Sequence, residues 1–120
     1  MATLSWKEEC KKLLENLNRS KDSIPFRQPV DFEQVPNYVL LVDQPMDLQT
    51  VGEKLHHYAT PKDFAEDVRL IFENSKKFKP NRNSVMYAMT DRLSDLFEEH
   101  FDNILTSYET QKTAAGCKSK

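Results

Sequence analysis

Hydrophobic positions near the start of the chain follow the period of an α-helix. Leu13 and Leu17 fall on one face of residues 5–19, and Lys and Glu side chains occupy most of the positions around them. Ser5 and Glu8 have the spacing of a capping box, in which each side chain accepts a hydrogen bond from the other residue's backbone N–H. We therefore predict a helix over residues 5–19.

The same period recurs in three later segments. Asp47 is a suitable N-cap for a short helix over about residues 48–55. Pro61, a residue type that fits the first position of a helix, opens a longer helix over about residues 61–77. A final helix is predicted over about residues 84–108.

A proline-rich segment separates the first helix from the second. Residues 22–45 read DSIPFRQPVDFEQVPNYVLLVDQP and combine four prolines with many hydrophobic side chains. A loop of this length is uncommon unless it is functional or disordered, and its apolar content argues against disorder. The whole chain has only two glycines, which disfavours tight hairpins. The sequence thus predicts an all-α protein, a four-helix bundle with a long ordered loop between helices one and two.

The composition is that of one soluble globular domain. The 120 residues are 38% hydrophobic and 30% charged, and the net charge of -2 removes the overall basic field that favours bulk nucleic-acid binding. No apolar run approaches the ~20 residues of a membrane span, and no signal peptide is visible, so we expect no membrane association. Cys10 and Cys117 lie near opposite ends and suggest neither a disulfide framework nor a metal site.

Groups that would support catalysis do not converge in the sequence. His56 and His57 are neighbours, so on a helix they would point about 100° apart and could not bind one metal ion together. His100 lies among acidic residues that are typical of a solvated helix face. We therefore expect that the protein is not an enzyme, with no catalytic residue, no metal site and no cofactor.

One end of the predicted bundle has the make-up of a binding site. The long loop carries Val30, Val35 and the hydroxyl of Tyr38, and the turn at residues 79–84 should reach the same end. A concave apolar site with a few polar groups is the usual form of a ligand pocket. From the periodicity alone, a loop that simply covers the core is favoured over a pocket, and both interpretations stay open.

Three segments resemble the signature of the bromodomain family. They are PFRQPVD at 25–31, VPNYVLLVDQPMDLQTV at 35–51 and DFAEDVRLIFENSKKF at 63–78, and the spacing between them is similar too. With the pattern at 80–99, they look most like the second bromodomain of the WD-repeat-containing bromodomain proteins. The resemblance implies a left-handed four-helix bundle.

The resemblance also implies a division of the chain and a role. The bromodomain would span residues 5–108, after an N-terminal extension at 1–4 and before a flexible C-terminal tail at 109–120. Bromodomains bind N-acetyl-lysine in histone tails and other proteins of chromatin. The implied partners are therefore acetylated histone tail peptides, the implied location is the nucleus, and the isolated domain would be a monomer.

Carried over by position, the resemblance also implies an acetyl-lysine pocket. Its hydrophobic members would form the shelf and walls, and Tyr38 would contact the acetyl oxygen through an ordered water. The implied set is Pro25, Phe26, Val30, Val35, Tyr38, Asn74, Phe78, Lys79 and Val85.

The chain departs from the family pattern at three of these positions or beside them. Lys79 stands where the family has the asparagine that donates to the acetyl carbonyl, Phe78 stands in place of a tyrosine, and Ile24 in place of a tryptophan. Asparagine is a short neutral donor, whereas lysine is a charged donor on a flexible stem. We expect binding roughly tens to hundreds of times weaker than that of a typical member.

A different function is suggested by the basic residues beside the same turn. Lys76, Lys77, Lys79 and Arg82 could contact phosphates, so a scaffold that recognises DNA or protein through this surface is the alternative. A run of charges is more often only a solvated face.

Overall fold

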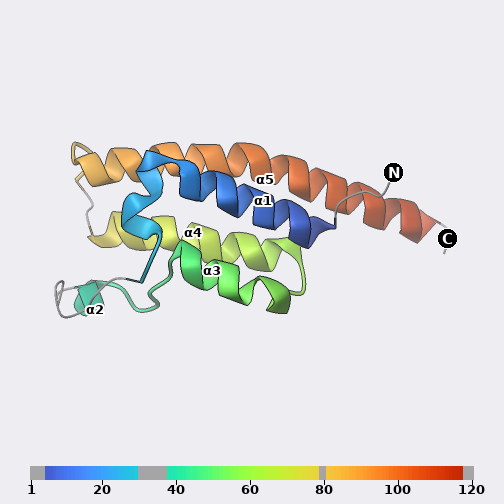
Figure 1. The fold of residues 1–120 in the computed structure, drawn as a ribbon, viewed down its shortest axis with the longest axis horizontal. Helices are drawn as coiled ribbons and strands as arrows, with labels where there is room; N and C mark the ends of the chain where they lie inside the picture. The colour runs from blue at the N-terminus through green and yellow to red at the C-terminus, as the bar shows by residue number, and fades with distance from the viewer. Residues whose placement is uncertain (1–4, 30–37, 79–80, 118–120) are drawn as a thin grey trace.

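Four main helices pack side by side to form a bundle (Figure 1). The structure is a computed structural model, and it describes residues 5–29, 38–78 and 81–117. The main helices are α1 (Trp6–Arg19), α3 (Leu48–Lys54), α4 (Pro61–Phe78) and α5 (Val85–Cys117). The described ranges contain helices and no strand, which confirms the predicted all-α four-helix bundle.

Helix α1 begins where its capping residues predict. The backbone N–H of Glu8 donates to Ser5 Oγ at 3.2 Å, and the backbone N–H of Ser5 donates to the Glu8 carboxylate at 3.3 Å. This reciprocal pair is the predicted capping box. The hydrophobic face of α1 is buried, and burial raises the pKa of the Cys10 thiol to about 12, so the thiol stays protonated.

The long segment between α1 and α3 contains two short helical turns. They are η1 (Lys21–Phe26), a 3-10 helix, and α2 (Tyr38–Leu41). Arg92 on α5 donates two hydrogen bonds to the Asp22 carboxylate, at 3.1 and 2.8 Å, and so ties η1 to α5. The backbone N–H of Gln49 donates to the carbonyl of Arg27 at 3.2 Å, which ties the end of η1 to α3.

Helix α3 is short and lies close to α1. The backbone N–H of Thr50 donates to the Asp47 carboxylate at 2.9 Å, as the predicted N-cap requires. A Cβ atom at Gly52 would come within 3.3 Å of Leu14 Cδ2, so glycine at this position allows the close approach of the two helices. The turn η2 (Leu55–His57) follows and leads to α4.

The two long helices, α4 and α5, run antiparallel (Figure 1). The sequence predicts the end of α4 well but not the end of α5. Helix α4 ends at Phe78, close to the predicted Lys77, and α5 begins after Ser84, whose Oγ accepts from the Tyr87 backbone N–H at 3.1 Å. The predicted end of α5 at residue 108 is wrong, because the helix continues to Cys117 (Figure 1). Residues 109–115 contain neither proline nor glycine, so no helix-breaking residue ends the helix in this stretch.

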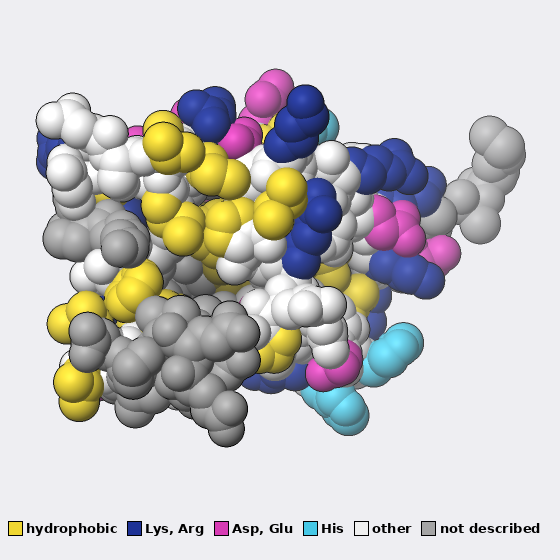
Figure 2. Space-filling view, turned by 60° about the vertical axis from the view of Figure 1, so that its left-hand side comes forward, with side chains coloured by type: hydrophobic (Ala, Val, Ile, Leu, Met, Phe, Trp, Pro, Cys, Tyr) yellow, Lys and Arg dark blue, Asp and Glu magenta, His cyan; other side chains and the backbone are white. Residues whose placement is uncertain are grey.

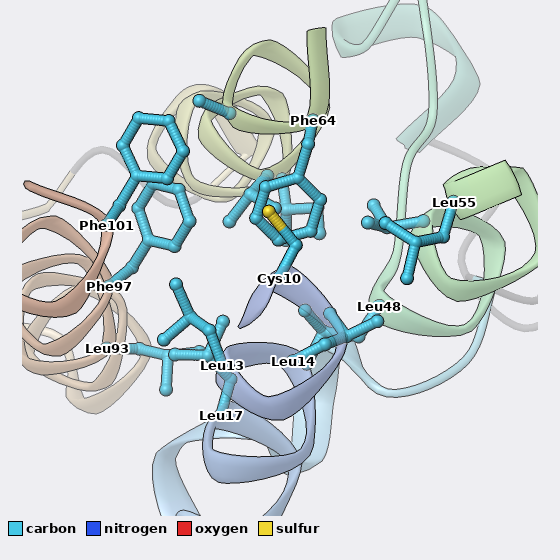
Figure 3. Packing of buried hydrophobic residues seen from close by; sticks show 14 of the residues in the cluster. Cys10, Leu13, Leu14, Leu17, Leu48, Leu55, Phe64, Leu93, Phe97 and Phe101 are labelled. Carbon is cyan, nitrogen blue, oxygen red and sulfur yellow. The ribbon is translucent and has the colours of Figure 1, made fainter. Parts of the chain in front are cut away.

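The core lies between the four main helices and is rich in aromatic rings (Figure 3). Phe64 of α4 and Phe97 of α5 have no exposed surface, and the stacked rings of Phe97 and Phe101 have centroids 5.3 Å apart. This packing fixes α4 against α5. The end of α4 at Phe78 and the start of α5 at Val85 lie at the same end of the bundle as η1 and α2 (Figure 1).

Candidate functional site

Four elements lie at one end of the bundle. They are η1, α2, the last turn of α4 and the first turn of α5 (Figure 1). Five residues that the sequence implies for a pocket lie on these elements: Pro25 and Phe26 on η1, Tyr38 on α2, Phe78 on α4, and Val85 on α5. The fold thus brings together side chains that lie far apart in the sequence.

Tyr38 is a polar aromatic residue at this end. Its side chain is buried, and its ring meets the ring of Phe78 edge-on, with 5.1 Å between the centroids. Burial raises the pKa of the Tyr38 phenol, and the nearby negative charge of Asp47 raises it further. The Tyr38 phenol therefore stays protonated, and the ring also packs as a core residue, a second role that the sequence does not predict.

The residues around the end differ sharply in exposure. Phe26 is buried and its ring packs edge-on against Phe72, with 6.5 Å between centroids. Ile24 is 60% exposed and Val85 is 74% exposed, although both are hydrophobic. Figure 2 turns this end forward and shows hydrophobic side chains gathered on it, while most Lys and Arg side chains in view lie further along the helices. This end therefore exposes several hydrophobic side chains, next to the exposed polar residues Lys77 and Arg82.

Asn74 has a partner within the protein. Its side chain is 2% exposed, and Nδ2 donates a hydrogen bond to the backbone carbonyl of Gln44 at 2.7 Å. The amide is thus engaged with the segment that follows α2. The sequence implies Asn74 for the pocket but does not indicate this contact.

Three residues of the implied pocket lie outside the described residues. They are Val30 and Val35 in the long loop and Lys79 in the turn after α4. Their assignment to the site therefore stays a sequence prediction.

The basic cluster beside the turn is partly neutralised. Lys76 Nζ lies 2.7 Å from the Asp91 carboxylate and 4.9 Å from the centroid of the Tyr87 ring. The hydrogen bond to Asp91 raises the pKa of Lys76. Lys77 and Arg82 are exposed, whereas Lys79 of the same cluster is not described.

The described residues contain neither a metal site nor a membrane-spanning helix. No three His, Cys, Asp or Glu side chains of these residues come together as metal ligands would, and His56, His57 and His100 are exposed. Among the described helices, none has both the length and the apolar character needed to cross a membrane.

Comparison with known proteins identifies relatives of this chain. The family model described as Bromodomain matches residues 10–92. Transcription factor GTE11 of Arabidopsis thaliana is 34% identical, over 99% of this chain and 19% of the relative. E3 ubiquitin-protein ligase TRIM33 of Xenopus laevis is 41% identical, over 72% of this chain and 8% of the relative. The chain therefore spans less than a fifth of either relative.

Among solved structures, the bromodomain of human BAZ1A is similar over almost its whole length. The TM-score is 0.79 at 27% sequence identity, and the match covers 86% of this chain and 97% of that one. The family match at residues 10–92 includes all four elements of the candidate site. This chain therefore belongs to the bromodomain family, a family of acetyl-lysine reader modules of chromatin.

Proposed function

We propose that this bromodomain binds acetyl-lysine in histone tails or other chromatin proteins of the nucleus, and that it binds weakly. The observation that supports this most is that η1, α2 and the adjoining ends of α4 and α5 lie at one end of the bundle with exposed hydrophobic side chains, and that the protonated phenol of Tyr38 lies there too. An apolar site with a few placed polar groups suits the neutral acetyl amide.

The weakness follows from the residue at position 79. An asparagine there would donate to the acetyl carbonyl from a short neutral amide, whereas Lys79 has to order a long stem, which costs up to ~2 kcal/mol. Taking its ammonium out of water costs more. The loss of one hydrogen bond to a neutral group is worth ~1 kcal/mol, and more if the ligand carbonyl stays buried without a partner.

Titration calorimetry with matched peptides tests the proposal. Acetylated histone peptides should bind and the same peptides with free lysine should not, because the free ammonium would lose its hydration in an apolar pocket. Equal affinity for both forms, or binding to neither at millimolar concentration, contradicts the proposed function.

Tyr38→Phe should weaken acetyl-lysine binding about threefold, because it removes one hydroxyl that organises water at the acetyl group. The fold should stay intact, since phenylalanine keeps the ring contact with Phe78. Calorimetry measures the affinity. Tyr58→Phe is the matched control. The Tyr58 hydroxyl donates to Asp67 of α4 at 2.6 Å, so its removal should lower stability and leave the affinity for the peptide unchanged. Unchanged affinity in Tyr38→Phe would count against the pocket assignment.

We also propose that the domain belongs to the subgroup of second bromodomains from WD-repeat-containing proteins. The support is the resemblance of residues 25–31 and 80–99 to that subgroup. The sequence of the full-length protein would decide this, because a WD-repeat region would have to precede the domain.

A second candidate function is the binding of DNA through the basic cluster, and the exposed Lys77 and Arg82 favour it. The pairing of Lys76 with Asp91 counts against it, since one of the four cations is already neutralised.

If the cluster binds phosphate, neutralising Lys76 and Lys77 together should weaken duplex binding for all sequences alike and reduce its dependence on salt. Fluorescence anisotropy of labelled DNA at low and physiological ionic strength measures both. Changing Lys11 and Lys12 of α1 to alanine removes the same charge elsewhere and serves as the control. A parent domain that binds no DNA even at low salt removes this candidate.

A further inference from the structure

The side chain of Asn74 joins α4 to the segment that carries Tyr38. Its Nδ2 donates to the Gln44 carbonyl at 2.7 Å, although the two residues are 30 positions apart in the chain. Asn74 is 2% exposed, so its side-chain amide has little access to water and depends on this partner within the protein. The bond therefore fixes the Gln44 carbonyl to α4.

The same face of α4 makes a second contact with this segment. Phe78 follows Asn74 by four residues, which places both side chains on one face, one helical turn apart. The ring of Phe78 meets the ring of Tyr38 edge-on at 5.1 Å. Two successive turns of α4 thus contact Gln44 and Tyr38, the two ends of one short segment.

The segment between these contacts, residues 38–44, is short and is held by an internal hydrogen bond. The backbone N–H of Val42 donates to the Tyr38 carbonyl at 2.9 Å, and the Val42 side chain is 2% exposed. Beyond Gln44, Asp47 caps α3 through the backbone N–H of Thr50. Because the chain after Gln44 is held at the start of α3, we expect a displacement of Gln44 to move the residues before it, towards Tyr38.

We propose that Asn74 is a positioning residue for the acetyl-lysine site: by holding the Gln44 carbonyl it fixes the segment from Tyr38 to Gln44, and with it the ring of Tyr38. In this role Asn74 acts through Tyr38 and does not contact the ligand. The choice of ligand rests on the proposed function, but the position of the segment can be measured without any ligand.

The affinity test uses two substitutions at Asn74. Asn74→Leu keeps the size of the side chain and removes the donor, and it should weaken binding of an acetyl-lysine peptide about threefold. Asn74→Gln retains an amide and should recover part of the loss. In the Tyr38→Phe background, Asn74→Leu should cost less than it does in the parent, because both changes act through one hydroxyl.

The ligand-free test is hydrogen exchange followed by NMR. In Asn74→Leu the amide of Val42 should exchange about tenfold faster, while the amide of Phe97 in the core should not change. Asn18→Leu is the matched control, since Asn18 Nδ2 also donates to a backbone carbonyl, that of Leu14 at 3.1 Å, but within α1. It should change neither the Val42 exchange nor the affinity.

Two results would overturn the proposal: unchanged exchange at Val42 in Asn74→Leu, or a loss of affinity that is equal in the parent and in the Tyr38→Phe background. If the parent binds no acetyl-lysine peptide, the proposed function fails, and the exchange at Val42 still decides whether Asn74 positions the segment. If Asn74→Leu does not fold, Asn74→Ser, whose shorter side chain also lacks the amide, takes its place in both measurements.

Discussion

Replacing Phe97 by alanine should lower the free energy of unfolding by about 3–5 kcal/mol, as is typical of a large aromatic residue removed from a core. Phe97 has no exposed surface, and its ring centroid lies 6.0 Å from that of Phe64, 6.2 Å from that of Phe72 and 5.3 Å from that of Phe101. The substitution leaves a cavity among these rings, which belong to both α4 and α5. Because neighbouring rings can fill it only in part, most of the lost contact energy stays lost.

Urea denaturation measures this effect. The midpoint should fall while the slope of unfolding free energy against urea stays the same, which shows that the folded state is still compact. Glu99→Ala is the control, since Glu99 lies on the same helix, is exposed, and should change stability by no more than about 0.5 kcal/mol. A loss below ~1 kcal/mol for Phe97→Ala would contradict the close packing of the rings.

The helix starts are predictable from sequence because local chemistry sets them. Ser5 with Glu8, and Asp47 with Thr50, make hydrogen bonds between residues three apart, so the pattern and the contact lie within one turn. The end of α5 is different. Hydrophobic periodicity stops near Tyr108, but residues 109–115 contain no glycine or proline to end the helix, which continues through Gly116 to Cys117.

The candidate site is less predictable, because its contacts are long-range. The apolar and proline-rich character of residues 22–45 predicts an ordered loop, but it does not indicate the helical turns η1 and α2. The bond from Asn74 ends on the carbonyl of Gln44, a group that every residue possesses, so no residue type marks the acceptor. The ion pair between Asp22 and Arg92 joins residues 70 positions apart, so local sequence patterns cannot predict it either.

The basic cluster shows how counting charges along a sequence can mislead. Lys76, Lys77, Lys79 and Arg82 are neighbours in the chain, but the fold sets the Asp91 carboxylate 2.7 Å from Lys76. A charge that is already paired attracts a phosphate less than a free one does. A test of the DNA hypothesis therefore has to consider the acidic residues of α5 that neutralise the lysines, as well as the lysines themselves.

Lys79→Asn should strengthen acetyl-lysine binding about fivefold, which corresponds to ~1 kcal/mol. Lys79 lies outside the described residues, so the expectation rests on its position in the sequence, one residue after the end of α4. The exchange supplies a short neutral amide that can donate to the acetyl carbonyl, and it removes the cost of ordering the lysine stem. Calorimetry with the same acetylated peptide measures the gain.

Two further substitutions separate the possible causes of such a gain. Lys77→Asn removes the same charge from an exposed position two residues earlier, so it should leave the affinity unchanged if donor geometry, rather than charge, is responsible. Lys79→Ala removes the lysine without supplying a donor. If Lys79→Asn binds no better than the parent and Lys79→Ala binds worse, Lys79 itself donates to the acetyl group. If neither change alters the affinity, the turn before Pro80 holds this position away from the ligand, and recognition then depends on Tyr38 and the apolar walls alone.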